Sequence, residues 1–231
     1  MTRSANCAPS SCGPDPVGKA CLVDVYDTIL RSDYPLRLRA MTALADVDAE
    51  VWVPEWNRTA IERDRGTISM AESFALTLRA CGKDPRPELV GELVSEDRRL
   101  LREGSRLYDD TVVFFGKLRS RGTGIALVSN CQDNTRQLLE YRGVLSLVDA
   151  AVLSCEIGSI KPSPEIYLTA LDDLGVAATD AVMVDDQVKF CVGAEAVGIR
   201  AIQIVRANHH GEIADSGFPV VPSLLDALPL L

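Results

Sequence analysis

Five short apolar runs recur along the chain, at residues 20–23, 124–128, 150–153, 181–184 and 201–205. Each run is continuous, whereas a strand with one face in solvent would alternate apolar and polar residues. Continuous runs of this length are typical of strands that are covered on both faces in a parallel sheet. The pattern therefore predicts five buried parallel strands.

Segments with helical start and stop signals lie between these runs. Three of them end at a glycine, the usual residue at a helix C-terminus, at Gly122, Gly143 and Gly198. Ser163 and Pro164 supply an N-cap and a first-turn proline for a further helix that runs to Gly175. The alternation of strands and helices predicts an α/β fold with a doubly wound, Rossmann-like parallel sheet.

Residues 34–106 break this alternation, because they carry helical patterns and no strand pattern. Ser69 and Glu72 form a capping box at the start of one helix. We therefore expect a helical cap at 34–106, an α/β core formed by 19–33 and 107–231, and a disordered tail at 1–18. An insertion after the first strand lies over the crevice where such folds bind ligands, so the cap is predicted to act as a lid.

Two sets of side chains in the predicted cap are assigned structural roles. Trp52 and Trp56 lie four residues apart and share a helix face, which we expect to be buried in the cap. The nearby arginines are expected to form a solvated charged face, at Arg58, Arg63 and Arg65.

Composition and charge exclude several classes of protein. The chain has 231 residues and a net charge of −9, which argues against nonspecific binding to nucleic acid or to an anionic membrane. No apolar run approaches the roughly 20 residues of a membrane helix, and residues 1–18 lack the apolar stretch of a secretory signal. The seven cysteines are odd in number and lie mostly in apolar segments, which favours reduced thiols and a cytoplasmic location. The adjacent His209 and His210, in a late loop, do not suggest a catalytic triad.

Polar residues gather at the carboxyl ends of the predicted strands. Asp24 follows the first strand, Ser129 follows the second, and the adjacent Asp185 and Asp186 follow the fourth. Two adjacent acids repel each other unless a cation lies nearby, and Mg²⁺ is the candidate. Lys161 lies just before a helix start, where a bound anion is favourable. The sequence thus predicts one pocket in which carboxylates hold a metal ion while lysine and serine hold anionic oxygens.

Four ordered segments resemble the four motifs of the haloacid dehalogenase (HAD) superfamily. They are Asp-Val-Tyr-Asp-Thr at 24–28, Ser-Asn at 129–130, Lys-Pro-Ser-Pro-Glu-Ile-Tyr at 161–167 and Val-Asp-Asp at 184–186. The resemblance extends from residue 20 to the C-terminus, and the helical insertion is similar to the cap that this superfamily carries after its first motif. It implies a hydrolase of a small anionic substrate, phosphorylated or halogenated. For the oligomeric state, both a monomer and a homodimer stay open.

The resemblance also implies catalytic and substrate-binding residues. Asp24 would be the nucleophile that forms a covalent aspartyl intermediate, and Lys161 would neutralise that nucleophile and the developing charge. Thr28 and Ser129 would position the anionic oxygens of the substrate, with Asn130 beside them.

A metal site is implied by the same resemblance. Asp185 would hold Mg²⁺ together with Asp24 and the backbone carbonyl of Tyr26, and Asp186 would support this site.

Two positions depart from the pattern of the family's phosphatases. Tyr26 stands where those enzymes carry a second aspartate that protonates the leaving oxygen, and a phenol with a pKa near 10 is a poor acid for that step. Phe190 stands where the fourth motif usually ends in Asn or Asp. We assign both rings to the lining of the substrate pocket. Asp27 lies one position further along the chain, and whether its carboxyl group replaces the missing acid stays open.

Four hypotheses follow for the reaction. The first is Mg²⁺-dependent release of phosphate from a small metabolite. The second, favoured by Tyr26, is carbon–halogen substitution through an Asp24 ester. The third is a lyase or cyclase in which Mg²⁺ draws off a (di)phosphate while Tyr26 and Phe190 offer aromatic faces to a carbocation. The fourth is a degenerate member that binds a ligand without turnover. Cys131, next to the second motif, is a further candidate as a sensor of substrate or oxidant.

Overall fold

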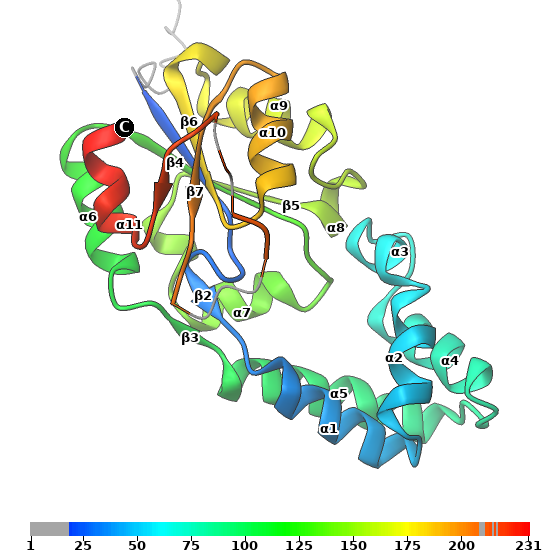
Figure 1. The fold of residues 1–231 in the computed structure, drawn as a ribbon. Coiled ribbons are helices and arrows are strands. Elements are labelled where there is room, and N and C mark those ends of the chain that lie inside the picture. The colour runs from blue at the N-terminus through cyan, green and yellow to red at the C-terminus, as the bar shows by residue number, and fades with distance from the viewer. Residues whose placement is uncertain (1–18, 208–210, 214, 216) are drawn as a thin grey trace, which may run out of the picture.

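The computed structural model describes residues 19–207, 211–213, 215 and 217–231, and it shows an α/β core from which a helical part projects (Figure 1). Among these residues, six strands form one parallel sheet in the order β5-β4-β1-β6-β7-β8. Their bounds are β1 Ala20–Val23, β4 Gly124–Ser129, β5 Ala150–Leu153, β6 Ala181–Asp185, β7 Arg200–Ile204 and β8 Val220–Val221. The five predicted strands and the α/β fold class are confirmed, and β8 was missed because it has only two residues.

Helices cover both faces of this sheet. One apolar cluster joins the sheet to α6, α7 and α11 and includes Phe114, Leu138 and Leu224, and a second joins it to α9 and α10 through Ile166 and Ala194. Because side chains from both clusters cover the strands, β1, β4 and β6 are buried at every position, as their continuous apolar runs require. The core helices are α6 Thr111–Ser120, α7 Thr135–Tyr141, α8 Ser154–Ile157, α9 Pro164–Leu174, α10 Val188–Ala196 and α11 Leu224–Ala227, with 3₁₀ turns at Leu145–Leu147, Ala178–Asp180 and Leu228–Leu230. Helix α10 runs from Val188 to Ala196 and so ends shortly before Gly198, the predicted stop.

Five further helices lie between two short strands, β2 Leu30–Arg31 and β3 Arg106–Leu107, which pair antiparallel. They form the helical cap, and Figure 1 shows them projecting from one end of the core. Their bounds are α1 Tyr34–Ala45, α2 Ala49–Asn57, α3 Ala60–Asp64, α4 Met70–Ala80 and α5 Pro87–Gly104. The segment 34–106, which was expected to contain no strand, therefore includes one strand residue, Arg106. It does so because the two chain segments that connect the core and the cap pair with each other.

The interior of the cap is aromatic, as the spacing of its tryptophans predicts. The rings of Trp52 and Trp56 stack with centroids 6.1 Å apart, and Trp56 stacks on Phe74 at 4.8 Å. Arg63 differs from its predicted position on a solvated face. It is buried, and its guanidinium lies 3.7 Å from the centre of the Trp56 ring while donating to the carbonyl of Trp56 and the hydroxyls of Thr59 and Ser73. The residue is buried because its side chain lies between Trp56 on α2 and Ser73 on α4.

Some expectations fall on residues that the structure does not describe. The predicted tail at 1–18, with Cys7 and Cys12, and the pair His209 and His210 lie outside the described residues. The cysteines within the described ranges are free thiols. In the same part of the chain, no helix combines the length and apolar character needed to cross a membrane.

Candidate active site

Asp24 lies at the carboxyl end of β1 and contacts the lysine that the sequence assigns to the same pocket. Its backbone N–H donates to the carbonyl of Val184 at 3.0 Å, so the pairing between β1 and β6 continues to Asp24. The Lys161 ammonium lies 2.6 Å from Asp24 Oδ1 and 2.6 Å from Asp185 Oδ2, and its side chain is fully buried. Segments far apart in sequence thus meet at one edge of the sheet.

The backbone of Lys161 is held by Asn130. Asn130 Nδ2 donates to the Lys161 carbonyl at 2.9 Å, and the Lys161 N–H donates to Asn130 Oδ1 at 2.6 Å. Both polar atoms of this amide are therefore engaged with the protein. Asn130 thus positions the backbone of Lys161, and its predicted contact with substrate stays a prediction.

Three buried carboxyl groups gather around one point. Oxygen atoms of Asp24, Asp185 and Asp186 lie within 4.8 Å of one another. Burial, together with repulsion from neighbouring carboxylates, raises the pKa of Asp185 to about 6 and that of Asp186 to about 8. Burial alone would lower the pKa of Lys161, but Asp185 and Asp24 outweigh it and raise that pKa above the ordinary value of 10.5.

The charges in this cluster do not balance. The acids outnumber the single ammonium, and the attraction of Lys161 does not offset the burial of Asp186. Carboxylate oxygens in such a group are the ligands that Mg²⁺ prefers. The described residues at this edge therefore fit a divalent cation.

Tyr26 and Asp27 lie in the tight turn that follows Asp24. The Tyr26 hydroxyl lies 3.0 Å from Thr135 Oγ1 on α7, and burial raises the pKa of Tyr26 above its usual 10. Asp27 is exposed and adopts the left-handed conformation, with φ 58°. Its carboxylate is one of the charges that raise the pKa of Asp186, so Asp27 contributes to the electrostatic field of the acid cluster.

Two hydroxyl groups at this edge are buried without strong partners. Thr28 is completely buried, and its Oγ1 has no hydrogen-bond partner within the described ranges. Ser129 is also buried, and its Oγ makes a long contact of 3.5 Å with the Asn130 carbonyl. A buried hydroxyl without a partner costs stability, so both groups are suited to donate to an anionic ligand.

Arg206, which the sequence analysis did not single out, fixes the turn that carries Thr28. Its guanidinium donates to the Thr28 carbonyl at 2.6 Å and to Asp110 at 2.7 and 3.0 Å, and it lies over the ring of Tyr108. Asp110 stands at the N-cap position of α6 but makes no side-chain cap there. Its carboxylate instead accepts from Arg206 and from the Leu224 N–H. The sequence offered one signal for this role, which is that Arg206 directly follows the last predicted strand at 201–205.

Phe190 lies against Lys161. Its ring centre is 4.7 Å from the Lys161 ammonium and 4.7 Å from that of Lys189, and the residue is 6% exposed. The Tyr167 hydroxyl donates to the Phe190 carbonyl at 2.8 Å, which fixes this turn of α10. An apolar face thus covers Lys161 where a polar side chain is usual.

Comparison with known proteins places this arrangement in a family. A sequence model described as haloacid dehalogenase-like hydrolase matches residues 19–198. The chain belongs to this family. This HAD-like hydrolase is 28% identical over 200 residues to a glyceraldehyde 3-phosphate phosphatase of Methanopyrus kandleri, covering 83% of this chain and 85% of the relative. It is 26% identical over 223 residues to (S)-2-haloacid dehalogenase 4A of Burkholderia cepacia, covering 92% and 94%.

The fold is shared with solved structures of the same family. A HAD phosphatase from Thermococcus onnurineus superposes with a TM-score of 0.68 and 22% identity, covering 92% of this chain and 97% of that one. The relatives thus include both phosphatases and a dehalogenase.

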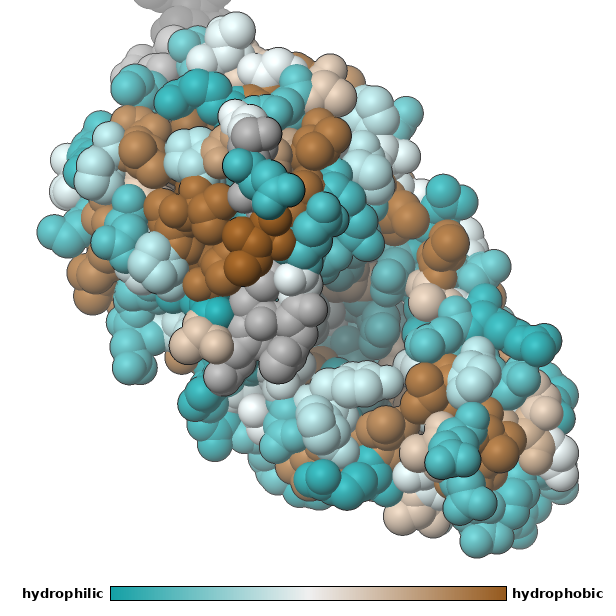
Figure 2. All heavy atoms as spheres, viewed as in Figure 1, coloured by the Kyte–Doolittle hydropathy of each residue, from teal (hydrophilic) through white to brown (hydrophobic). Residues whose placement is uncertain are grey.

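The helical cap of this HAD-like hydrolase contacts the loop that follows Ser129 and Asn130. Asp97 on α5 accepts from Arg37 on α1 at 2.5 Å and from Asn134 at 2.9 Å, and Asp133 accepts from the Met70 N–H at 3.1 Å. Figure 2 shows the molecule hollowed between the core and the cap, with hydrophilic side chains visible in the hollow. The position of the cap is therefore tied to the loop after the second motif.

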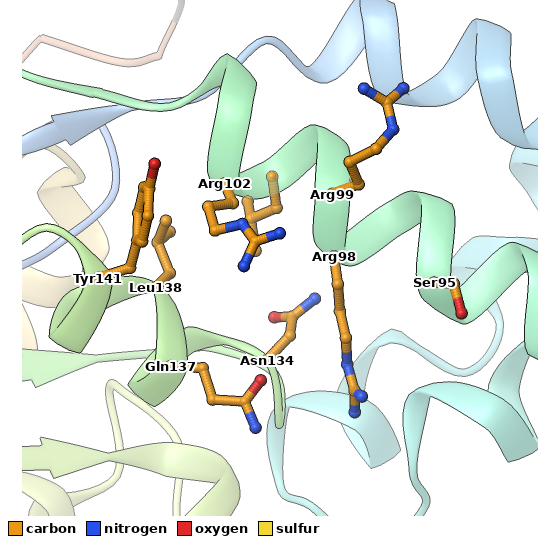
Figure 3. A pocket seen from close by; sticks show the side chains of 9 residues that line it. Ser95, Arg98, Arg99, Arg102, Asn134, Gln137, Leu138 and Tyr141 are labelled. Carbon is orange, nitrogen blue, oxygen red and sulfur yellow. The ribbon is translucent and has the colours of Figure 1, made fainter.

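A separate cavity lies between the cap helix α5 and the core helix α7 (Figure 3). It has a volume of about 250 Å³, and its lining includes Arg98, Arg102, Gln137 and Tyr141. None of the predicted site residues lines it. It is distinct from the carboxylate cluster.

Proposed function

We propose that this HAD-like hydrolase releases phosphate from a small phosphorylated metabolite in a Mg²⁺-dependent reaction, with Asp24 as the nucleophile. The observation that carries the proposal is the excess of buried carboxyl groups around one ammonium, formed by Asp24, Asp185, Asp186 and Lys161. Uncompensated buried charge is costly, and a divalent cation relieves it.

The acid cluster supplies the ligands for such an ion. Asp24, Asp185 and Asp186, together with the backbone carbonyl of Tyr26, would hold it. Asp185 already accepts from Lys161 and from the Gln187 N–H, one bond on each oxygen, whereas Asp186 has the more strongly raised pKa. When bound, Mg²⁺ neutralises charge on the phosphoryl oxygens and on the carboxylates.

The residues of the chain account for the remaining chemistry. An Asp24 oxygen attacks phosphorus and forms an O–P bond as the bond to the leaving oxygen breaks, and water then hydrolyses the aspartyl phosphate. Lys161 orients Asp24 and balances its charge throughout. The hydroxyls of Thr28 and Ser129 donate to the phosphoryl oxygens, and their burial makes these hydrogen bonds stronger than in water.

The leaving oxygen receives little general acid catalysis from the protein. The Tyr26 hydroxyl is bonded to Thr135 and its pKa is raised, so it is a weak acid at neutral pH. General acid catalysis typically contributes about 10²–10⁴ in rate. We therefore propose that the substrate has a leaving oxygen that is stable as an anion, as in aryl, acyl or enol phosphates.

The second candidate is substitution at a carbon that bears a halogen. Asp24 would attack carbon and halide would leave, which requires no acid at Tyr26. The similarity to (S)-2-haloacid dehalogenase 4A over 92% of the chain also supports this candidate. It ranks second because a halide displacement gives no reason for the pair Asp185 and Asp186.

The other two hypotheses have weaker support. The lyase or cyclase hypothesis needs free aromatic faces, whereas the Phe190 ring contacts the Lys161 ammonium. A non-catalytic binder needs no nucleophile. The direct contact between Asp24 and Lys161 keeps the proposed nucleophile and its counter-charge together, which a binder would not require.

One experiment separates the candidates. The protein is freed of metal with a chelator and assayed with p-nitrophenyl phosphate, 2-chloropropionate and an allylic diphosphate, each with and without Mg²⁺. We expect phosphate release that requires Mg²⁺ and falls at least about 10³-fold in Asp24→Asn, with no loss in the surface control Asp46→Asn. Halide release without Mg²⁺ would instead establish the dehalogenase candidate. A metal-independent phosphatase activity would overturn the proposal.

A further inference from the structure

Two cysteines lie just beyond neighbouring strands of the sheet, Cys131 in the loop after β4 and Cys155 in helix α8 after β5. Ser129 on β4 pairs with Leu153 on β5 at the end of their parallel register. Cys131 and Cys155 each follow two residues later, and their Sγ atoms lie 3.9 Å apart. The loop that follows β4 and the first turn of α8 therefore place the two thiols as neighbours.

The two thiols differ in exposure and acidity. Cys131 is buried, whereas Cys155 is partly exposed. The contact with the Cys131 thiol lowers the pKa of the Cys155 thiol, and the same contact, with burial, raises the pKa of Cys131. Oxidants attack the thiolate form. Cys155 is thus the accessible, more acidic thiol, and Cys131 is the thiol beside it.

The remaining thiols in the described ranges have raised pKa values. Burial raises the pKa of Cys21 to about 12, and burial also raises the pKa of Cys191. The pKa of Cys81, in the cap, is raised as well. Among these described thiols, a lowered pKa is found at Cys155.

This pair lies between the proposed catalytic residues and the cap. Cys131 directly follows Asn130, whose amide holds the backbone of Lys161. The Cys131 N–H donates to Ser154 Oγ, which donates to the Asp64 carbonyl in the cap. Hydrogen bonds therefore connect the segment of Cys131 to both Lys161 and the cap.

The cap also touches Cys155 through its backbone. A Cβ built on Gly66 would lie 1.9 Å from the Cys155 carbonyl oxygen, and Gly66 has φ 68°. No side chain fits between these segments, so the contact leaves little room for a shift of Cys155.

We propose that Cys131 and Cys155 form an oxidation site, at which a hydroperoxide joins them in a disulfide and thereby slows the hydrolase. The Cys155 thiolate attacks a peroxide oxygen, and the O–O bond breaks to give a sulfenic acid and, with a proton, water or an alcohol. The Cys131 sulfur then attacks the sulfenic sulfur, and its proton leaves with the hydroxyl as water. Two thiols lose two electrons, and the peroxide gains them.

Disulfide formation draws the sulfur atoms from 3.9 Å to about 2.05 Å. We propose that a shift of the segment that carries Asn130 and Cys131 takes up part of this difference, and rotation about the cysteine χ1 angles the rest. A misplacement of about 1 Å at catalytic groups costs up to about 10²-fold in rate. The slowing rests on the proposed function, whereas the disulfide itself does not.

The test treats the 231-residue protein with hydrogen peroxide, in a background where Cys7 and Cys12 are replaced by serine. Peptide mass spectrometry without reduction reports the linkage, and p-nitrophenyl phosphate reports activity before and after dithiothreitol. We expect a 131–155 linked peptide and at least a fivefold loss of kcat/KM that dithiothreitol reverses. Cys155→Ser should lack both effects, and Cys81→Ser should behave like the parent.

The outcomes are separable. Absence of the linked peptide after peroxide treatment overturns the proposal, whatever the activity. A linked peptide with unchanged kcat/KM overturns the slowing and retains the modification site. If no phosphatase activity exists, the linked peptide still tests the oxidation site, because the mass measurement is independent of turnover.

Discussion

The ammonium of Lys161 and the ring of Phe190 lie 4.7 Å apart, so an aromatic face covers the cation that balances Asp24 and Asp185. In a site closed to water, a cation–π contact contributes about 0.5–2 kcal/mol. Phe190 thus adds to the positioning of Lys161 without offering any polar atom of its side chain to the reaction.

Replacing Phe190 with leucine should therefore reduce activity moderately. Phe190→Leu keeps an apolar side chain and removes the aromatic face, so we expect kcat/KM to fall about 2- to 30-fold, which corresponds to about 0.5–2 kcal/mol. Steady-state kinetics with p-nitrophenyl phosphate measure it. Lys189→Gln, which removes the exposed ammonium on the same ring, is the matched control and should stay within about twofold. Equal effects in the two variants would contradict a specific role for the contact with Lys161.

The stability of the metal-free protein should decrease as the pH rises. The pKa of Asp185 is raised to about 6 and that of Asp186 to about 8, both above the ordinary 3.8. Their protonated forms are favoured in the folded state, so they stabilise it below about pH 4, and this stabilisation is lost as the pH passes through 6 and 8. Thermal unfolding in chelator should show a falling Tm from about pH 5 to about pH 8.5.

Magnesium should oppose this loss. The ion binds the ionised carboxylates, so the increase in Tm on adding Mg²⁺ should be larger at about pH 8 than at about pH 5. Asp186→Asn should flatten the pH dependence in chelator and reduce the response to Mg²⁺, and Asp226→Asn, on the surface, serves as the control. A Tm that rises across this range in chelator would show that the acid cluster is not buried as described.

The leaving-group preference should change when Tyr26 becomes aspartate. Tyr26→Asp introduces a carboxyl group that can donate a proton, so we expect kcat/KM for an alkyl phosphate to rise at least about tenfold, within the range of general acid catalysis. The rise for p-nitrophenyl phosphate should be smaller, because that leaving group needs no proton. Tyr26→Phe removes the hydroxyl that contacts Thr135 and should give no such gain. Parallel gains for both substrates would argue that Tyr26 limits access rather than proton transfer.

Arg206 should affect both stability and substrate binding. Arg206→Gln leaves the Asp110 carboxylate without its partner and releases the Thr28 carbonyl, so we expect the free energy of unfolding to fall by about 3 kcal/mol. KM should rise more than kcat falls, because Thr28 is proposed to bind substrate oxygens. Denaturant unfolding and kinetics at a temperature where the variant is folded measure the two effects. Arg99→Gln, which breaks exposed ion pairs, should cost less than about 1 kcal/mol, and a similar small cost for Arg206→Gln would contradict its anchoring role.

The elements of the fold could be predicted from local sequence patterns. Continuous apolar runs identified the buried strands, because a strand covered on both faces has no position left for a polar side chain. Pro164 and Gly175 marked the ends of α9 for equally local reasons. Since the carboxyl ends of parallel strands lie at one edge of the sheet, the gathering of Asp24, Lys161 and Asp185 also followed from order along the chain.

Contacts between distant segments were decided only by the tertiary structure. Whether an arginine such as Arg63 or Arg206 is solvated or buried depends on which helix or turn packs over it, and that packing has no signature in neighbouring residues. The 3.9 Å separation of the Cys131 and Cys155 sulfur atoms likewise depends on how the loop after β4 lies against α8. The sequence by itself determined the periodic elements and the chemistry at their ends, because those depend on near neighbours. The structure decided which side chains are partners, because burial and pairing arise only when separate segments pack together.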